Sequence, residues 1–67
     1  MSAETFRIEG MTCDHCVRAV TMELLMVPGV ASVDVSLEAG TATVRSEAPL
    51  PREAVRDAVE EAGYTLA

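Results

Sequence analysis

The spacing of the apolar residues changes repeatedly along this 67-residue chain, and the order of those changes restricts the fold more than any other feature. Three segments alternate apolar and polar residues, which is typical of half-buried β-strands. Their inward positions are Phe6 and Ile8, then Val33, Val35 and Leu37, and finally Ala42 and Val44. A further short strand is expected over residues 64–66.

Two other segments have the spacing of amphipathic helices. The first is expected over residues 14–26, with an inner face formed by Val17, Val20, Thr21 and Leu24. The second is expected over residues 52–62, with an inner face formed by Val55, Ala58, Val59 and Ala62. Pro28-Gly29 stops the first helix, and Gly63 suits the end of the second because glycine readily adopts the left-handed conformation found there.

The resulting order is strand, helix, strand, strand, helix, strand, which predicts an α+β fold of the ferredoxin-like βαββαβ type. In this fold a four-stranded antiparallel sheet carries both helices on one face, and residues 38–40 supply the turn of a hairpin. A chain of this length is expected to form one domain, residues 1–67. It offers little room for an enclosed active site, which argues against an enzyme.

The net charge is −6, and all five basic residues are arginines. This balance argues against nucleic acid and against an anionic membrane surface as partners, and it favours a basic surface on another protein. No apolar run approaches the roughly 20 residues of a membrane span, and residues 1–6 lack the features of a signal peptide. We therefore expect a cytoplasmic protein, in which the two cysteines stay reduced.

The segment from Gly10 to Cys16 carries the chemistry, because it leads from the first strand into the first helix. Residues three apart on a helical turn have Cβ atoms about 5–6 Å apart, so the sulfurs of Cys13 and Cys16 can converge on one ion. The free N–H groups of a helix N-terminus favour the thiolate form. Thiolates select soft ions such as copper(I). A structural zinc ion needs four ligands, and the chain has only two cysteines and one histidine.

Residues 10–16, Gly-Met-Thr-Cys-Asp-His-Cys, resemble the GMTCxxC motif of heavy-metal-associated domains. This family includes bacterial copper chaperones of the CopZ type and the N-terminal domains of copper-transporting P-type ATPases. Residues 27–30 and 60–64 extend the resemblance over nearly the whole chain. The resemblance implies that Cys13 and Cys16 bind copper(I), and that the chain passes it by ligand exchange to the metal-binding domain of a copper-transporting ATPase or to a copper-sensing repressor.

The resemblance also implies roles for three neighbours of the cysteines. Met11 is expected to pack inward and fix the loop rather than bind metal. Thr12 stands where zinc- and cadmium-transporting relatives often carry aspartate, which favours copper(I). Tyr64 matches the aromatic residue of a loop beside the metal. The lysine that eukaryotic chaperones typically carry near this loop is absent here.

The positions of the remaining candidate residues indicate their roles. His15 is expected to face solvent, either as an ordinary polar residue, or tuning the thiols, or serving as a third ligand in a metal-bridged homodimer. The metal-free chain is expected to be a monomer. Asp14 suits the positive end of the helix dipole, and it could also steer the chain to a basic partner. Met22 and Met26 have the spacing of helix packing residues and are expected to fill the core or its edge.

Several alternatives remain open at this stage. The chain could be an excised domain of a copper-transporting ATPase, although the start at Met1 and the end at Ala67 favour a free chaperone. Mercury(II) also binds two thiolates in a line, and the motif does not exclude it. A dithiol oxidoreductase and a purely structural module are disfavoured alternatives from other functional classes.

Overall fold

The computed structural model describes residues 2–67 and contains two helices and four strands in the expected order. The elements are β1 (Ser2–Glu9), α1 (Asp14–Leu25), β2 (Val30–Ser36), β3 (Thr41–Ser46), α2 (Arg52–Glu61) and β4 (Thr65–Leu66). The helices end one residue before the predicted bounds, because Met26 and Ala62 are their C-caps. The predicted α+β, ferredoxin-like fold class is confirmed.

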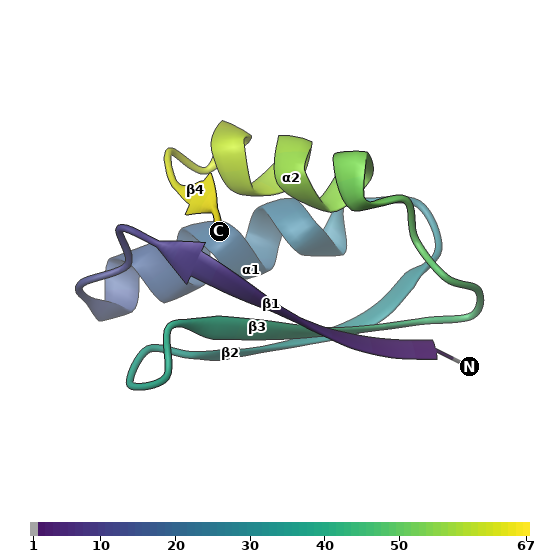
Figure 1. Cartoon of the computed structure of the whole chain (residues 1–67), viewed down its shortest axis with the longest axis horizontal. Coiled ribbons are helices and arrows are strands. Elements are labelled where there is room, and N and C mark those ends of the chain that lie inside the picture. The colour runs from purple at the N-terminus through teal and green to yellow at the C-terminus, as the bar shows by residue number, and fades with distance from the viewer. Residues whose placement is uncertain (1) are drawn as a thin grey trace.

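The four strands form one sheet in the order β2-β3-β1-β4, with every neighbouring pair antiparallel. Both helices lie on the same side of this sheet, as Figure 1 shows. The loop that connects β1 to α1 and the loop that connects α2 to β4 lie at the same end of the molecule (Figure 1). This topology brings the cysteine segment close to Tyr64, although about 50 residues separate them along the chain.

The core lies between the sheet and the helices, and it consists of side chains from β1, β3, α1 and α2. Its buried members are Phe6, Ile8, Val20, Leu24, Ala42, Val44, Val55, Ala58 and Val59. The strand residues among them are the inward positions of the alternating pattern, and the residues of α2 belong to its predicted inner face. This agreement confirms that apolar period 2 and period 3.6 mark the two kinds of element here.

Three predictions about individual side chains were wrong or incomplete. Leu37 is not in β2, because the last cross-strand pair joins Ser36 to Thr41 and residues 37–40 form the turn. Val17 and Thr21 are only half-buried, and the buried stripe of α1 consists instead of Cys16, Val20 and Leu24. The inner face of the first helix is thus rotated toward Cys16.

The prediction that Met22 and Met26 fill the core was also wrong, because their exposed fractions are 66% and 73%. A residue two positions from Val20 or Leu24 is rotated by about 200° around a helix axis, since each residue advances about 100°. Both methionines therefore lie nearly opposite the buried stripe. The spacing of Met22 and Met26 does place them on one face of the helix, but that face is exposed to solvent.

The end of α2 places Tyr64 beside the cysteine segment. The N–H of Tyr64 donates to the carbonyl of Val59 at 3.1 Å, and the N–H of Gly63 donates to the carbonyl of Glu60 at 2.9 Å. This pair of bonds is the Schellman helix ending, which requires a left-handed residue after the C-cap. Gly63 supplies it with φ 97°. The predicted role of Gly63 in ending the second helix is confirmed, and it turns the chain toward β4.

Candidate metal centre

The loop between β1 and α1 begins at Gly10, which adopts a positive φ of 95°. A Cβ atom at this position would lie 3.3 Å from Cδ1 of Tyr64, closer than ordinary van der Waals contact. Glycine therefore serves two purposes here. It permits the left-handed backbone at the strand end, and it allows the tyrosine ring to approach the loop.

Cys13 occupies the N-cap of α1 with an extended backbone, φ −156° and ψ 172°. Its carbonyl accepts hydrogen bonds from the N–H groups of Cys16 at 3.1 Å and Val17 at 3.3 Å, which form the first turn of the helix. No side chain caps this helix end, so the Cys13 side chain is free of that role. The local sequence thus places one cysteine just outside the helix and the other just inside it.

The two cysteines differ in exposure although their sulfurs lie close together. Cys13 is exposed, whereas Cys16 is buried with an exposed fraction of 6%. Their Sγ atoms are 3.4 Å apart and both are free thiols. The predicted convergence of the two sulfurs at the start of the helix is therefore present. One sulfur is held in the protein, and the other faces solvent.

The surroundings of Cys16 lower the pKa of its thiol from 9.0 to about 6. Hydrogen bonding from the backbone of Thr12 is the largest cause, and hydrogen bonding with the side chain of Tyr64 is the next. Burial opposes these effects, because it disfavours the charged form, and the Cys13 thiol and backbone add smaller favourable contributions. These contacts accordingly favour the thiolate form of Cys16 near neutral pH.

Tyr64 is affected in the opposite direction by the same contact. Its pKa is raised, first because its hydroxyl is hydrogen-bonded to Cys16, and then because of burial and the nearby sulfur charges. A protonated hydroxyl facing a thiolate is a stable arrangement, since the hydroxyl can donate to the anion. Tyr64 packs against the core, as expected, and the effect on its pKa concerns its hydroxyl and Cys16.

The remaining residues of the motif differ in burial, and Met11 and His15 do so as expected. Met11 is half-buried and packs against the core, and Thr12, Asp14 and His15 are exposed. Sequence reasoning attributed the favoured thiolate to the helix N-terminus in general, and it missed the part played by the Thr12 backbone. The sequence likewise gave no indication that Gly10 lies beside Tyr64. Neither contact has a sequence signal, because both depend on the folded loop.

Within residues 2–67, no group of three or more histidine, cysteine, aspartate or glutamate side chains is arranged to hold a metal ion. A closed four-ligand site is therefore not formed by the described part of the chain. In the same residues, no helix has both the length and the apolar character that crossing a membrane requires. What the arrangement offers is a two-sulfur site at the surface of one end of the fold.

Comparison with known proteins places this geometry among metal-binding domains. The family model described as "Heavy-metal-associated domain" matches residues 5–65. A copper chaperone CopZ of Staphylococcus saprophyticus is 43% identical over 69 residues, covering 98% of both chains. Copper-transporting ATPase 2 of Rhizobium meliloti is 49% identical over 59 residues, covering 88% of this chain and 7% of the ATPase. A solved structure of a CopZ metallochaperone superposes with a TM-score of 0.91 at 37% identity, covering 98% of this chain and 100% of that one.

Proposed function

This chain belongs to the heavy-metal-associated domain family, and from that premise we propose that it is a copper chaperone that carries one copper(I) ion between Cys13 and Cys16. The proposal rests above all on the two free sulfurs that lie 3.4 Å apart at the start of α1. The relatives named as copper chaperones match over essentially the whole chain, which supports copper as the cargo.

The donor set favours copper(I) over zinc. Thiolates are soft ligands and select soft ions. Two thiolates complete the coordination of an ion that needs only two ligands. Zinc requires four ligands, and residues 2–67 present no cluster that would complete them. Since metal–sulfur bonds are about 2.3 Å long, an ion held in a line between two sulfurs would separate them by about 4.6 Å. The exposed Cys13 side chain can supply that movement, because it is not engaged in capping α1.

The unequal exposure of the cysteines suggests how the ion leaves. A thiolate of an acceptor protein approaches from the side of Cys13 and forms a third bond to copper. The bond between copper and Cys13 then breaks, and that sulfur takes up a proton from water. A second acceptor thiolate replaces Cys16 in the same way, so copper keeps at least two sulfur ligands throughout and its charge does not change. Cys16 is released last, because it is buried and its thiolate is stabilised by Thr12 and Tyr64.

The acceptor is proposed to be the metal-binding domain of a copper-transporting ATPase, and a copper-sensing repressor is a further candidate. A sequence relative within such an ATPase shares 49% identity with this chain, so donor and acceptor would present similar loops to each other. A net charge of −6 favours an acceptor with a basic face and speeds the encounter. The two free thiols suit a reducing compartment such as the cytoplasm. In this role the chain is a carrier, and no catalytic step is assigned to it.

Anaerobic titration of the reduced chain with copper(I), zinc(II) and mercury(II), each against a competing chelator, tests the proposal. We expect one copper(I) per chain, held far more tightly than zinc. Cys13→Ser and Cys16→Ser should each weaken copper(I) binding by more than about a hundredfold, since removal of a ligand exceeds the tenfold to hundredfold effect of a supporting residue. His15→Gln is the matched control within the motif and should keep the one-to-one stoichiometry.

Three outcomes would contradict the proposal. Preference for zinc would show that further ligands complete the site. Tighter binding of mercury(II) in competition with copper(I) at cellular thiol concentrations would favour the mercury alternative. Unchanged copper binding in both cysteine variants would remove the site from residues 13 and 16 altogether.

A further inference from the structure

Large apolar side chains are exposed on the second half of α1, away from the thiols. The exposed fractions are 66% for Met22, 49% for Leu25 and 73% for Met26. Met26 follows Cys16 by ten residues, which corresponds to about 15 Å along a helix axis. The metal centre therefore does not account for this exposed apolar surface.

A groove of about 350 Å³ lies between the end of α1 and α2, with Met26 as one of its walls. Small or apolar side chains line part of it, among them Val27, Pro28, Ala54 and Ala58, and we call this part its floor. Two of these come from the segment after α1 and two from α2, so both helices of the layer contribute. We call this feature the acid-rimmed groove, for the reason given next.

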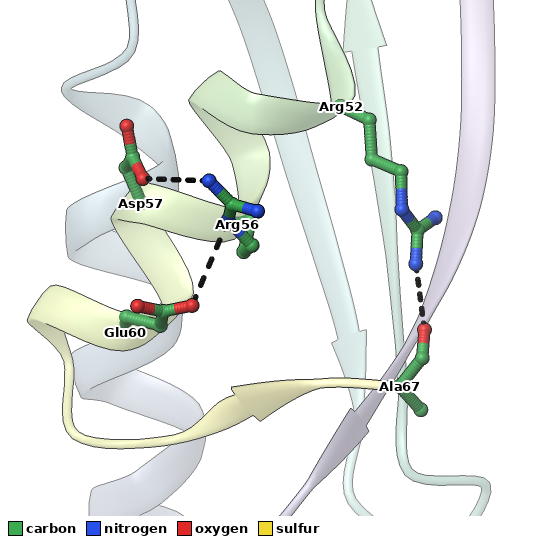
Figure 2. A network of polar contacts seen from close by, with 5 residues as sticks. All are labelled: Arg52, Arg56, Asp57, Glu60 and Ala67. Carbon is green, nitrogen blue, oxygen red and sulfur yellow. Dashed lines mark hydrogen bonds and ion pairs between the residues drawn. The ribbon is translucent and has the colours of Figure 1, made fainter.

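Three acidic residues also line the groove, namely Glu23 from α1 and Asp57 and Glu61 from α2, and we call them its rim. Arg56 lies 3.9 Å from Asp57 and also 3.7 Å from Glu60, as Figure 2 shows. These three side chains are all more than half exposed, so the pairing is weakened by solvent. In residues 2–67, Glu23 and Glu61 form no ion pair within 4.0 Å. The rim therefore keeps an excess of negative charge.

The end of α1 also lies at the groove. The C-terminal end of a helix carries a partial negative charge from its free carbonyl groups, which basic side chains in the last turn usually offset. The last turn of α1 has none, and Met26 and Val27 line the groove. Ala54 in the first turn of α2 lines it too, and the positive partial charge of that helix start opposes the charge of the α1 end. The negative charge of the groove therefore comes from its carboxylates.

We propose that the acid-rimmed groove is a second docking surface of this protein, and that it binds an arginine- or lysine-bearing amphipathic segment of a protein partner. The aliphatic stem of such a side chain and its apolar neighbours would lie on the floor and against Met26, while the cationic head meets the carboxylates. A second copy of this chain is a poor occupant, because each copy carries a net charge of −6. An anionic membrane is disfavoured for the same reason.

The docking surface is tested on the metal-free, reduced, ¹⁵N-labelled chain, so that the outcome does not depend on copper binding. The probe is a synthetic helical peptide with leucines along one face and arginines beside them. The control peptide has glutamates in place of the arginines. We expect the arginine peptide to shift backbone amide signals of residues 23–27 and 54–61 while those of residues 12–16 stay in place. The glutamate peptide should leave all of these signals unchanged.

Matched variants separate the groove from general attraction to an acidic protein. Glu23→Gln combined with Asp57→Asn should weaken binding of the arginine peptide by about twofold or more, since each exposed pair is worth about 0.2–1 kcal/mol. Glu4→Gln combined with Glu38→Gln removes the same charge from exposed positions outside the groove and should change the affinity less. Met26→Ser should also weaken binding, and the amide spectrum of each variant shows whether it stays folded.

Several results would overturn the proposal. Equal weakening by the two double variants would mean that only net charge matters. Equal binding of the glutamate peptide would remove the role of the carboxylates. Amide shifts centred on residues 12–16 would move the contact to the metal centre. Self-association in sedimentation that is lost in Met26→Ser would assign the surface to a second copy of the chain.

Discussion

The N-terminal end of α1 buries Cys16 beside Tyr64, whereas the C-terminal end of the same helix leaves Met22, Leu25 and Met26 exposed. We refer to these regions as the thiol end, residues 10–16 with Tyr64, and the methionine end, residues 22–26. At the thiol end, backbone N–H groups and the tyrosine stabilise an anion. At the methionine end, free carbonyl groups and acidic side chains favour a cation. One helix thus presents two surfaces of opposite electrostatic preference.

The comparison also separates two ways in which a sequence uses its apolar residues. The thiol end relies on close packing of the Tyr64 ring against a residue without a side chain, since a Cβ atom at Gly10 would press against that ring. At the methionine end, the side chains of Met22, Leu25 and Met26 stay outside the core, which leaves them available to a partner. The predictions below test whether the fold and the metal centre depend on the two ends in the way this contrast requires.

The largest expected effect concerns adjacent leucines near the methionine end. Leu24 is fully buried, whereas Leu25 is 49% exposed. Leu24→Ala should lower the free energy of unfolding by about 2–5 kcal/mol, because it leaves a cavity in the core. Leu25→Ala should change it by no more than about 0.5 kcal/mol. Urea unfolding of the metal-free chain measures both. A similar cost for the two variants would show that the outer side of this helix end contributes to the fold.

A smaller effect is expected at the thiol end from Gly10→Ala. Its positive φ should cost about 1–2 kcal/mol in an alanine, and the new methyl group should also displace the ring of Tyr64. Gly29→Ala is the matched control, because Gly29 has a similar φ of 92° but its nearest contact would be an ordinary 3.7 Å. Both variants should lose stability, and only Gly10→Ala should release copper faster to a chelator.

Fluorescence makes this comparison sharper. Tyr64 is the only tyrosine and there is no tryptophan, so tyrosine emission reports on this ring alone. The emission should change in Gly10→Ala and remain as in the wild type in Gly29→Ala. Identical emission and identical copper release in the two variants would show that Gly10 serves the backbone only.

The pH dependence of stability should also distinguish the thiol end. The pKa of Cys16 is about 6 in the folded chain and 9.0 for an unperturbed thiol. Between these values the unfolded chain binds more protons at this site, so stability rises with pH. The contribution of Cys16 is therefore complete above pH 9 and is lost as the pH falls through 6. Urea midpoints of the wild type and of Cys16→Ser should diverge progressively from pH 6 to pH 9. A difference that stays constant over this pH range would mean that the Cys16 thiol of the folded chain does not ionise below pH 9.

Much of this molecule follows from its sequence, and the exceptions have a common cause. The order of elements, the core positions of β1 and β3, and the pairing of Cys13 with Cys16 all follow from local periodicity and spacing. The burial of Cys16 and the exposure of Met22 depend on how α1 is rotated about its axis. That rotation is set by packing against the sheet. The sequence of α1 has apolar residues on two faces, so its pattern alone does not determine which face is buried.

The metal centre shows the same limit at closer range. Spacing places both sulfurs at the start of a helix, and the general effect of a helix N-terminus predicts a low thiol pKa. The larger contributions in the fold come from the Thr12 backbone and from Tyr64. The first depends on the path of the four-residue loop, residues 10–13, that leads into the helix. The second joins residues that are far apart in sequence. Neither contribution can be predicted from the residues of the motif alone.

The smallest expected effect, and the one that divides the thiol end into its parts, comes from Tyr64→Phe. This change keeps the ring that contacts Gly10 and removes only the hydroxyl. The pKa of Cys16 should rise above 6, because the second largest cause of its low value is lost, but it should stay below 9.0 because the Thr12 backbone still stabilises the thiolate. The rate of iodoacetamide alkylation as a function of pH, measured in a Cys13→Ser background, reports this midpoint for Cys16 alone. A midpoint that does not move would assign the stabilisation to the loop backbone, and Tyr64 would then act at this end only through the packing of its ring.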